Sequence, residues 1–213
     1  GIASCAGAMS RKRPRQTATA AEIRDEQYYS QDASTCGDEL EKACGCVALA
    51  NALVVHAAPE APLLTPAEII SEAVALRSFD QHGIPLESLR ALCEHTSGRW
   101  DLGLKVQVRH PCCAIAPGML MYVSGVALMN AQCGMQYEDA KFDSHVVTVE
   151  AVAPDGTITV INPDRRISQR TRAGFVADAW GRMKITKESI DTVWRTTRAD
   201  GTTTTRAAIS LRL

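Results

Sequence analysis

The chain has 213 residues, of which 46% are hydrophobic and 22% charged, and its formal net charge is -1. This balance is typical of a folded domain with a sizeable core, and it provides no broad basic field that would recruit nucleic acid or a membrane surface. No apolar run reaches the roughly 20 residues needed to cross a bilayer. From the charge balance and the lack of such a run, we expect neither nucleic acid nor a membrane as a partner.

Residues 1–20 are small, polar and basic, and the cluster SRKRPRQ occupies 10–16. This composition predicts a disordered, solvated tail, although such a cluster could also bind a polyanion or act as a nuclear-localisation signal. The rest of the chain has no internal repeat and no clean linker. We therefore expect a single domain over 21–213.

The first half of this domain is expected to be mainly helical. Helices are predicted at 44–57, 65–78 and 85–98. The first is apolar on all sides, which is typical of a helix in the centre of a core. Thr65 can cap the second, with Pro66 in its first turn and Glu68 at the capping-box position, and Gly98 is expected to end the third.

The second half has the alternation and the β-branched residues of strands. Strands are predicted at 104–110, 118–130 (one or two), 145–152, 157–162 and 202–213, with mixed character at 187–197. The turn PDG at 154–156 joins two of these strands into a hairpin. Helices followed by antiparallel strands predict an α+β fold, in which an N-terminal helical half packs on a C-terminal antiparallel sheet.

Eight cysteines lie along the chain, at positions 5, 36, 44, 46, 93, 112, 113 and 133. The chain is longer than the small secreted domains that depend on disulfides, and no secretory leader is visible. We therefore expect a cytoplasmic, reducing environment in which most thiols are free. Disulfides are the alternative if the protein is exported.

Cys44 stands where a thiolate would be favoured. Polar residues precede it and an apolar helix follows it, so its sulfur would lie at the positive end of the helix dipole. A nucleophilic thiol also needs a histidine that takes its proton and a third polar group that orients this histidine. Cys46 lies about 200° further around the helix and is expected to pack in the core.

His145 is the best placed of the five histidines to serve as that base. His56 lies at the far end of the helix that begins at Cys44, and His110 ends a strand. His82 and His95 lie in polar helical surroundings, which predict surface positions. His145 instead opens the predicted hairpin, at the mouth of a central strand.

The second strand of the hairpin returns to the same end and delivers Asn162 and Asp164. The first residue of one hairpin strand and the last residue of its partner are neighbours. Either of these two side chains could therefore hold the imidazole of His145.

Three stretches of the chain, in this order, resemble papain-like cysteine peptidases of a compact kind. They are CGCVALANAL at 44–53, HVVTVEAV at 145–152 and DGTITVINP at 155–163. The likeness is to the leader-peptide peptidases of bacteriocin transporters and to phytochelatin synthases. It extends from Cys44 to Asp164, and the order Cys, His, Asn or Asp is its most specific part.

The resemblance implies a papain-like fold with Cys44 as the nucleophile, His145 as the base and Asn162 as the orienting residue. The family also places a glutamine before the nucleophile, where its amide helps to hold the oxyanion. The nearest glutamine here is Gln31, which lies closer to Cys36 than to Cys44. QDASTCG is therefore a rival nucleophile motif, although the charged DELEK after Cys36 does not suit a buried helix.

The activity implied by the resemblance is cleavage or transfer of an acyl group at a peptide or amide bond, through a thioester on the cysteine. The acyl group would pass to water in a peptidase, or to an amine in a transpeptidase or amide synthase of the phytochelatin-synthase type. The expected partner is a peptide or thiol-peptide substrate. We expect no metal and no other cofactor, and the oligomeric state stays open.

Two other classes of protein stay open at this stage. One is a zinc or iron site, although the spacing C-x7-C-x-C lacks the C-x2-C knuckle typical of such sites. The other is a papain-like fold without activity, used for binding. The candidate ligands of the metal site are Cys36, Cys44, Cys46, His110, Cys112 and Cys113.

Overall fold

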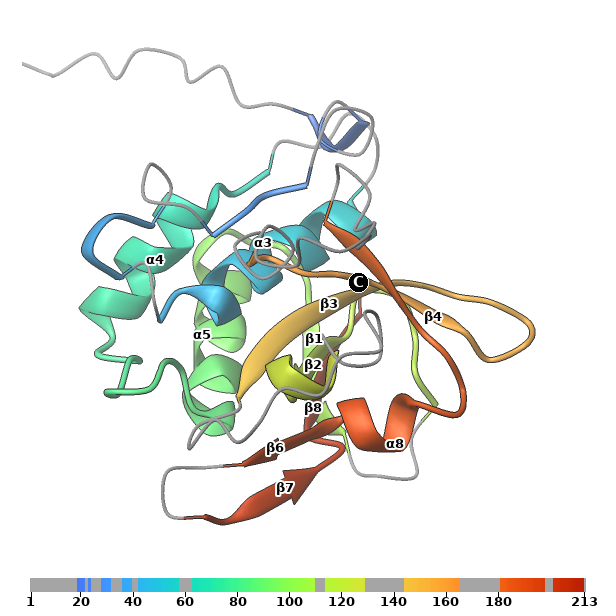
Figure 1. Ribbon diagram of the computed structural model, residues 1–213. Helices are drawn as coiled ribbons and strands as arrows, with labels where there is room; N and C mark the ends of the chain where they lie inside the picture. The colour runs from blue at the N-terminus through green and yellow to red at the C-terminus, as the bar shows by residue number, and fades with distance from the viewer. Residues whose placement is uncertain are drawn as a thin grey trace, which may run out of the picture.

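A computed structural model describes the fold over residues 19–21, 23, 28–31, 36–39, 42–57, 63–109, 114–128, 144–164, 181–197 and 201–212. Helices come first and antiparallel strands second (Figure 1), which confirms the predicted α+β class. The elements in chain order are η1 (Gly37–Glu39), α3 (Cys44–His56), α4 (Pro66–Ala75), α5 (Leu86–Arg99), β1 (Lys105–Arg109), β2 (Leu120–Val123), β3 (His145–Val152), β4 (Ile158–Ile161), β5 (Arg182–Ile185), α8 (Ile190–Val193), β6 (Arg195–Thr197), β7 (Thr203–Thr205) and β8 (Ala208–Arg212).

Six of the strands form one sheet in the order β1-β8-β2-β3-β4-β5. Every neighbouring pair is antiparallel. The predicted hairpin is present as β3 and β4, which lie between β2 and β5 in the sheet. β8, from the end of the chain, lies between β1 and β2, and β6 and β7 form a separate two-stranded ribbon.

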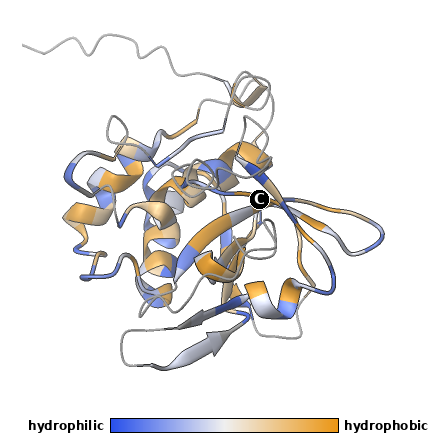
Figure 2. Ribbon diagram, in the orientation of Figure 1, coloured by the Kyte–Doolittle hydropathy of each residue, from blue (hydrophilic) through white to orange (hydrophobic). Residues whose placement is uncertain are grey.

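The sheet separates two hydrophobic clusters, because alternate side chains of a strand point to opposite faces. Val146 of β3 packs in the cluster that contains α3, α4 and α5. Val147 and Val149 pack in the second cluster, with Val193 and Trp194 from the region of α8. The strands of the sheet and α3 are therefore rich in hydrophobic residues (Figure 2).

The helix α3 is buried along nearly its whole length and packs on β3 and α4. Its position confirms the prediction of a central core helix. The second predicted helix is also confirmed, as α4, with its capping box in place: the Glu68 N–H donates to Oγ1 of Thr65, and the Thr65 N–H donates to the Glu68 carboxylate.

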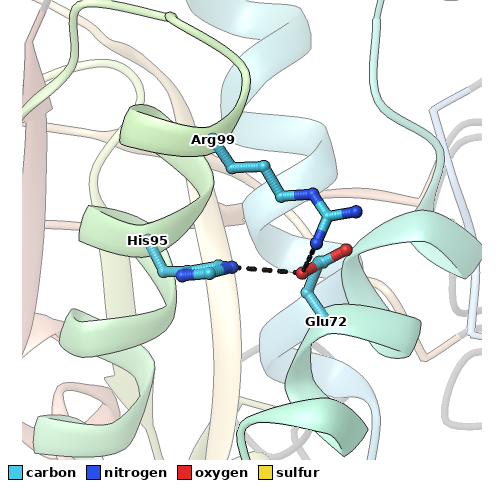
Figure 3. A network of polar contacts seen from close by, with 3 residues as sticks. All are labelled: Glu72, His95 and Arg99. Carbon is cyan, nitrogen blue, oxygen red and sulfur yellow. Dashed lines mark hydrogen bonds and ion pairs between the residues drawn. The ribbon is translucent and has the colours of Figure 1, made fainter.

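Glu72 joins α4 to α5 (Figure 3). Its carboxylate accepts a hydrogen bond from Arg99 at 2.8 Å and lies 3.1 Å from Nε2 of His95. His95 lies at the surface, with 37% of its side chain exposed, but its ring faces Glu72, a partner that the sequence did not predict. The helical pattern places His95 in its helix but gives no information about a partner on another helix. His82 is exposed, as predicted.

Three element boundaries differ from the predictions. Gly98 lies inside α5, which continues to Arg99, and the chain turns just afterwards at Gly103, whose φ is 66°. The stretch 118–130, for which one or two strands were predicted, contains the strand β2 and, within its described part 118–128, a helical turn at 125–128. The last stretch holds two strands, because the chain turns at Arg206 (φ 55°) between β7 and β8.

Residues 1–18 of the predicted tail lie outside the described residues, whereas Ala20 is fully buried against the helical core. The cysteines that the structure describes are free thiols, as expected; they are Cys36, Cys44, Cys46 and Cys93. The remaining cysteines lie outside the described residues. None of the described helices is long and apolar enough to span a membrane.

Candidate active site

Cys44 is the first residue of α3. Ala43 precedes it as the N-cap residue and provides no side-chain cap. The N–H groups of a first helical turn have no partner within the helix, so they remain available to groups at this end. One of them, the N–H of Gly45, donates to the Cys44 sulfur. Cys46, as expected, is fully buried in the core.

His145 is the first residue of β3 and lies in the middle of the sheet, opposite Val123 of β2. Its side chain is hydrogen-bonded to the Cys44 thiol, and the N–H of Val146 donates to the same sulfur. His145 is buried, with a relative exposure of 8%. The N-terminus of α3 and the start of β3 therefore meet at the thiol.

Asn162 follows the last residue of β4 and holds His145 from the other side. Its Oδ1 lies 2.8 Å from Nε2 of His145 and accepts a hydrogen bond from the N–H of Asp164 at 2.9 Å. Its Nδ2 donates to the sulfur of Met183 at 3.3 Å. A main-chain N–H can only donate, so the atom facing His145 must be the amide oxygen.

This orientation of the Asn162 amide decides the tautomer of His145. An amide oxygen accepts, so Nε2 of His145 must carry the hydrogen. In the neutral ring Nδ1 is then the basic nitrogen, and it is the one left for the Cys44 thiol. The asparagine thus presents the imidazole to the thiol as a proton acceptor.

The register of the hairpin explains why His145 and Asn162 meet. Thr148 pairs with Ile161, so one step further along the ladder Asn162 stands opposite Val147. His145 lies two residues beyond Val147 on the same face of the sheet. Diagonal neighbours of this kind are within reach of long side chains.

The site shifts both ionisable groups toward their charged forms. Burial would raise the pKa of the Cys44 thiol, but the hydrogen bond and charge of His145 and the N–H groups of Val146 and Gly45 outweigh it, so the pKa lies below its ordinary value. Burial likewise lowers the pKa of His145, yet the thiolate, the Asn162 bond and the Asp164 charge raise it overall. The arrangement favours a thiolate beside an imidazolium.

Gln31, the predicted oxyanion residue, lies beside the end of β4. Its N–H donates to the carbonyl of Pro163 at 2.7 Å, and its side chain is buried. Two residues earlier, the main-chain N–H and carbonyl of Tyr29 are both bonded to the side chain of Asn51, which is fully buried in α3. The segment 28–31 is thus bonded both to α3 and to the residues after Asn162.

The two alternates occupy different positions. Cys36 is buried but is followed by η1, a single 3-10 turn whose Gly37 is exposed, and not by a long buried helix. Asp164 lies at the site, where its N–H orients the Asn162 amide and its negative charge favours protonated His145. The N–H of Asn162 donates to the carbonyl of Gly181 at 2.8 Å, and a Cβ added at Gly181 would lie only 2.9 Å from the carbonyl oxygen of Asn162.

Sequence reasoning missed the two N–H groups at the thiol and the role of Asn51. Main-chain donors cannot be located from the sequence, because every residue except proline has a main-chain N–H. Asn51 does have a signal: it is a polar residue in the middle of an apolar helix, and burial requires that its amide be bonded.

Among the described residues, no group of three or more histidine, cysteine and acidic side chains could hold a metal ion. The other ligands considered from the sequence, His110, Cys112 and Cys113, lie outside the described residues. No protein-family model matches the chain, and no curated protein matches it in sequence.

Proposed function

We propose that this protein is a papain-like cysteine enzyme that cleaves or transfers an acyl group at a peptide or amide bond. One observation carries the proposal: the Cys44 thiol, at the start of a buried helix, is hydrogen-bonded to a buried histidine that is itself oriented by Asn162. These are the three groups that nucleophilic cysteine catalysis requires. The perturbed pKa values of both partners support the same function.

In the first half of the reaction the Cys44 thiolate attacks the carbonyl carbon and forms a tetrahedral oxyanion. The main-chain N–H of Cys44, in the first turn of α3, would stabilise this oxyanion, with the amide of Gln31 as the second donor. His145 then gives its proton to the leaving nitrogen as the carbon–nitrogen bond breaks. The products are a free amine and a thioester on Cys44.

In the second half an incoming nucleophile attacks the thioester, and His145 accepts its proton. Water as the nucleophile gives a peptidase, and an amine gives a transpeptidase or amide synthase. In both cases the Cys44 thiolate leaves and the His145 imidazolium is restored. We propose a peptide or thiol-peptide as the substrate and the cytoplasm as the location.

The test combines alkylation with intact mass. Iodoacetamide at limiting concentration should label Cys44 first, and Cys44→Ser should remove this label while Cys36→Ser leaves it. His145→Ala should slow it strongly. Incubation of the wild-type protein with peptides and thiol-peptides, followed by acid quenching, should then reveal an acyl adduct that maps to Cys44.

The same experiment separates the alternatives. Preferential labelling of Cys36 would make QDASTCG the nucleophile motif. A folded protein whose Cys44 is labelled no faster than a free cysteine would contradict the enzyme and favour a binding module. Stoichiometric zinc or iron in the purified protein, lost in Cys44→Ser, would favour the metal site.

A further inference from the structure

Thr148 connects the strand that carries His145 to the helix that carries Cys44. Its Oγ1 donates a hydrogen bond to the main-chain carbonyl of Ala48, at 2.6 Å, and the side chain is fully buried. Thr148 lies three residues after His145 in β3, and Ala48 lies one helical turn after Cys44 in α3. The bond is therefore close to the site and joins its two halves.

The surroundings of this hydroxyl are apolar. Val146, its neighbour on the same face of β3, belongs to the cluster beneath the helices, and so do Val47 and Leu49 of α3. A valine would have the same shape as Thr148 and would need no partner. A buried hydroxyl is costly unless it is bonded, so the bond to Ala48 accounts for the presence of threonine here.

Apolar packing alone sets the position of α3 along the sheet only weakly. The hydrophobic effect has no direction, and most of the residues of α3 have small or medium apolar side chains. A shift of one residue along a helix moves it by about 1.5 Å. Misplacement of a reacting group by about 1 Å can cost a hundredfold in rate.

We propose that Thr148 is a positioning residue, which fixes the axial position of α3 on β3 and so holds the Cys44 sulfur within hydrogen-bond reach of His145. This inference rests on the proposed function, because it concerns the same thiol and imidazole. Thr148 touches neither the substrate nor the reacting atoms; it acts through the helix.

The test compares Thr148→Val, Thr148→Ser and Thr96→Val by the pH profile of iodoacetamide alkylation at Cys44. Thr96→Val is the matched control, because Thr96 is also fully buried and its hydroxyl has no hydrogen-bond partner among the described residues. Each variant is first checked for its fold by circular dichroism and thermal unfolding. The serine variant keeps the hydroxyl and loses only a methyl group.

Thr148→Val should lower the alkylation rate near pH 6 at least about tenfold and move the profile to higher pH. Thr148→Ser should restore most of the wild-type rate, and Thr96→Val should leave the profile unchanged. If the bond only stabilised the fold, its loss in Thr148→Val would lower the unfolding temperature and leave the alkylation profile unchanged. A wild-type profile in folded Thr148→Val therefore overturns the inference.

Thr148→Ala is the second variant without the hydroxyl, for use if the valine does not fold. Thr148→Ser and Thr148→Ala differ by one oxygen atom, so equal profiles for these two also overturn the inference. Failure of the proposed function looks different. In that case the wild-type Cys44 itself is alkylated no faster than a free cysteine near pH 6, and the inference falls with it.

Discussion

Oδ1 of Asn162 lies 2.8 Å from Nε2 of His145, with both side chains buried at one end of the central hairpin. The bond decides which ring nitrogen of His145 is basic, because it requires a hydrogen on Nε2. A variant without this oxygen should therefore change the chemistry of the thiol, although Asn162 does not touch the thiol in the proposed mechanism.

Asn162→Ala should slow alkylation of Cys44 near pH 6 about tenfold, because loss of a bond that raises the pKa of His145 weakens the ion pair. The rate against pH, measured by mass spectrometry, checks this. Asn162→Asp keeps the acceptor and adds a charge that favours imidazolium, so it should stay close to wild type. An alanine variant with the wild-type profile would contradict an orienting role.

Asp164→Asn distinguishes the two candidates for that role. The bond from Asp164 to the Asn162 amide comes from its main chain, so the substitution keeps this bond and removes the negative charge. His145 should then be slightly easier to deprotonate, and the alkylation rate should change less than in Asn162→Ala. A larger loss in Asp164→Asn would assign the orienting role to Asp164.

The reactivity of Cys44 should extend to unusually low pH. Its pKa lies below the ordinary value, so the thiolate persists at pH values where a free thiol, with a pKa of about 8.5, is protonated. The rate should fall only when the pH drops below this lowered pKa. The elevated pKa of His145 keeps the imidazolium charged above the usual range of histidine.

His145→Ala supplies the control for this pH dependence. It removes the hydrogen bond and the charge that lower the pKa of Cys44, while the burial that raises it stays. The alkylation profile should therefore move to higher pH, beyond that of a free thiol. Profiles of wild type and His145→Ala that coincide would show that no ion pair forms.

Gly118 packs against His56 at the end of α3. Its φ is 77°, and a Cβ there would lie 1.8 Å from Nε2 of the His56 ring. Gly118→Ala should destabilise the fold by about 2 kcal/mol or more, from left-handed backbone strain and from displacement of a packed ring. Urea unfolding measures the change.

Gly156→Ala is the matched control, because Gly156 has a similar φ of 86° but its Cβ would make only ordinary contact with Lys187, at 3.6 Å. It should show the backbone strain alone. In the double variant Gly118→Ala/His56→Ala the clash is gone. Its loss of unfolding free energy should therefore be smaller than the sum of the losses in the two single variants. Equal losses for the two glycines would contradict the clash.

Glu72 should contribute modestly to stability and nothing to the thiol chemistry. Its side chain is 11% exposed, but Arg99 is 55% exposed, so solvent screens much of the interaction. Glu72→Gln should destabilise by about 1 kcal/mol, with an unchanged alkylation profile. Glu87→Gln, which alters a looser and more exposed pair with Arg90, should show no measurable change in thermal unfolding.

The main elements of the site can be predicted from local sequence. The apolar run after Cys44, the capping box at Thr65 and the PDG turn each indicate an element through short-range physics, and each element is present. The PDG turn brings the ends of the hairpin together, but Asn162 lies on the face of His145 only because the register shifts between Val149 and Ala151, and no local signal indicates that shift.

The features that the sequence did not reveal depend on long-range packing. No local pattern indicates that β8 lies between β1 and β2, or that a helical turn at 125–128 follows a strand within one apolar run. The bond from Thr148 to Ala48 is of the same kind, because it exists only once α3 lies on β3.

The place of β8 in the sheet also has a consequence for synthesis. His145 and Asn162 are 17 residues apart and can come together as a hairpin, in microseconds, as soon as both have been made. Contacts between α3 and β3 instead close a loop of 100 residues, and β2 gains its second neighbour only after residues 208–212 have left the ribosome. Until α3 has packed on β3, Cys44 lacks the hydrogen bond and charge of His145 that lower the pKa of its thiol, so the nascent chain should be less reactive before this contact forms.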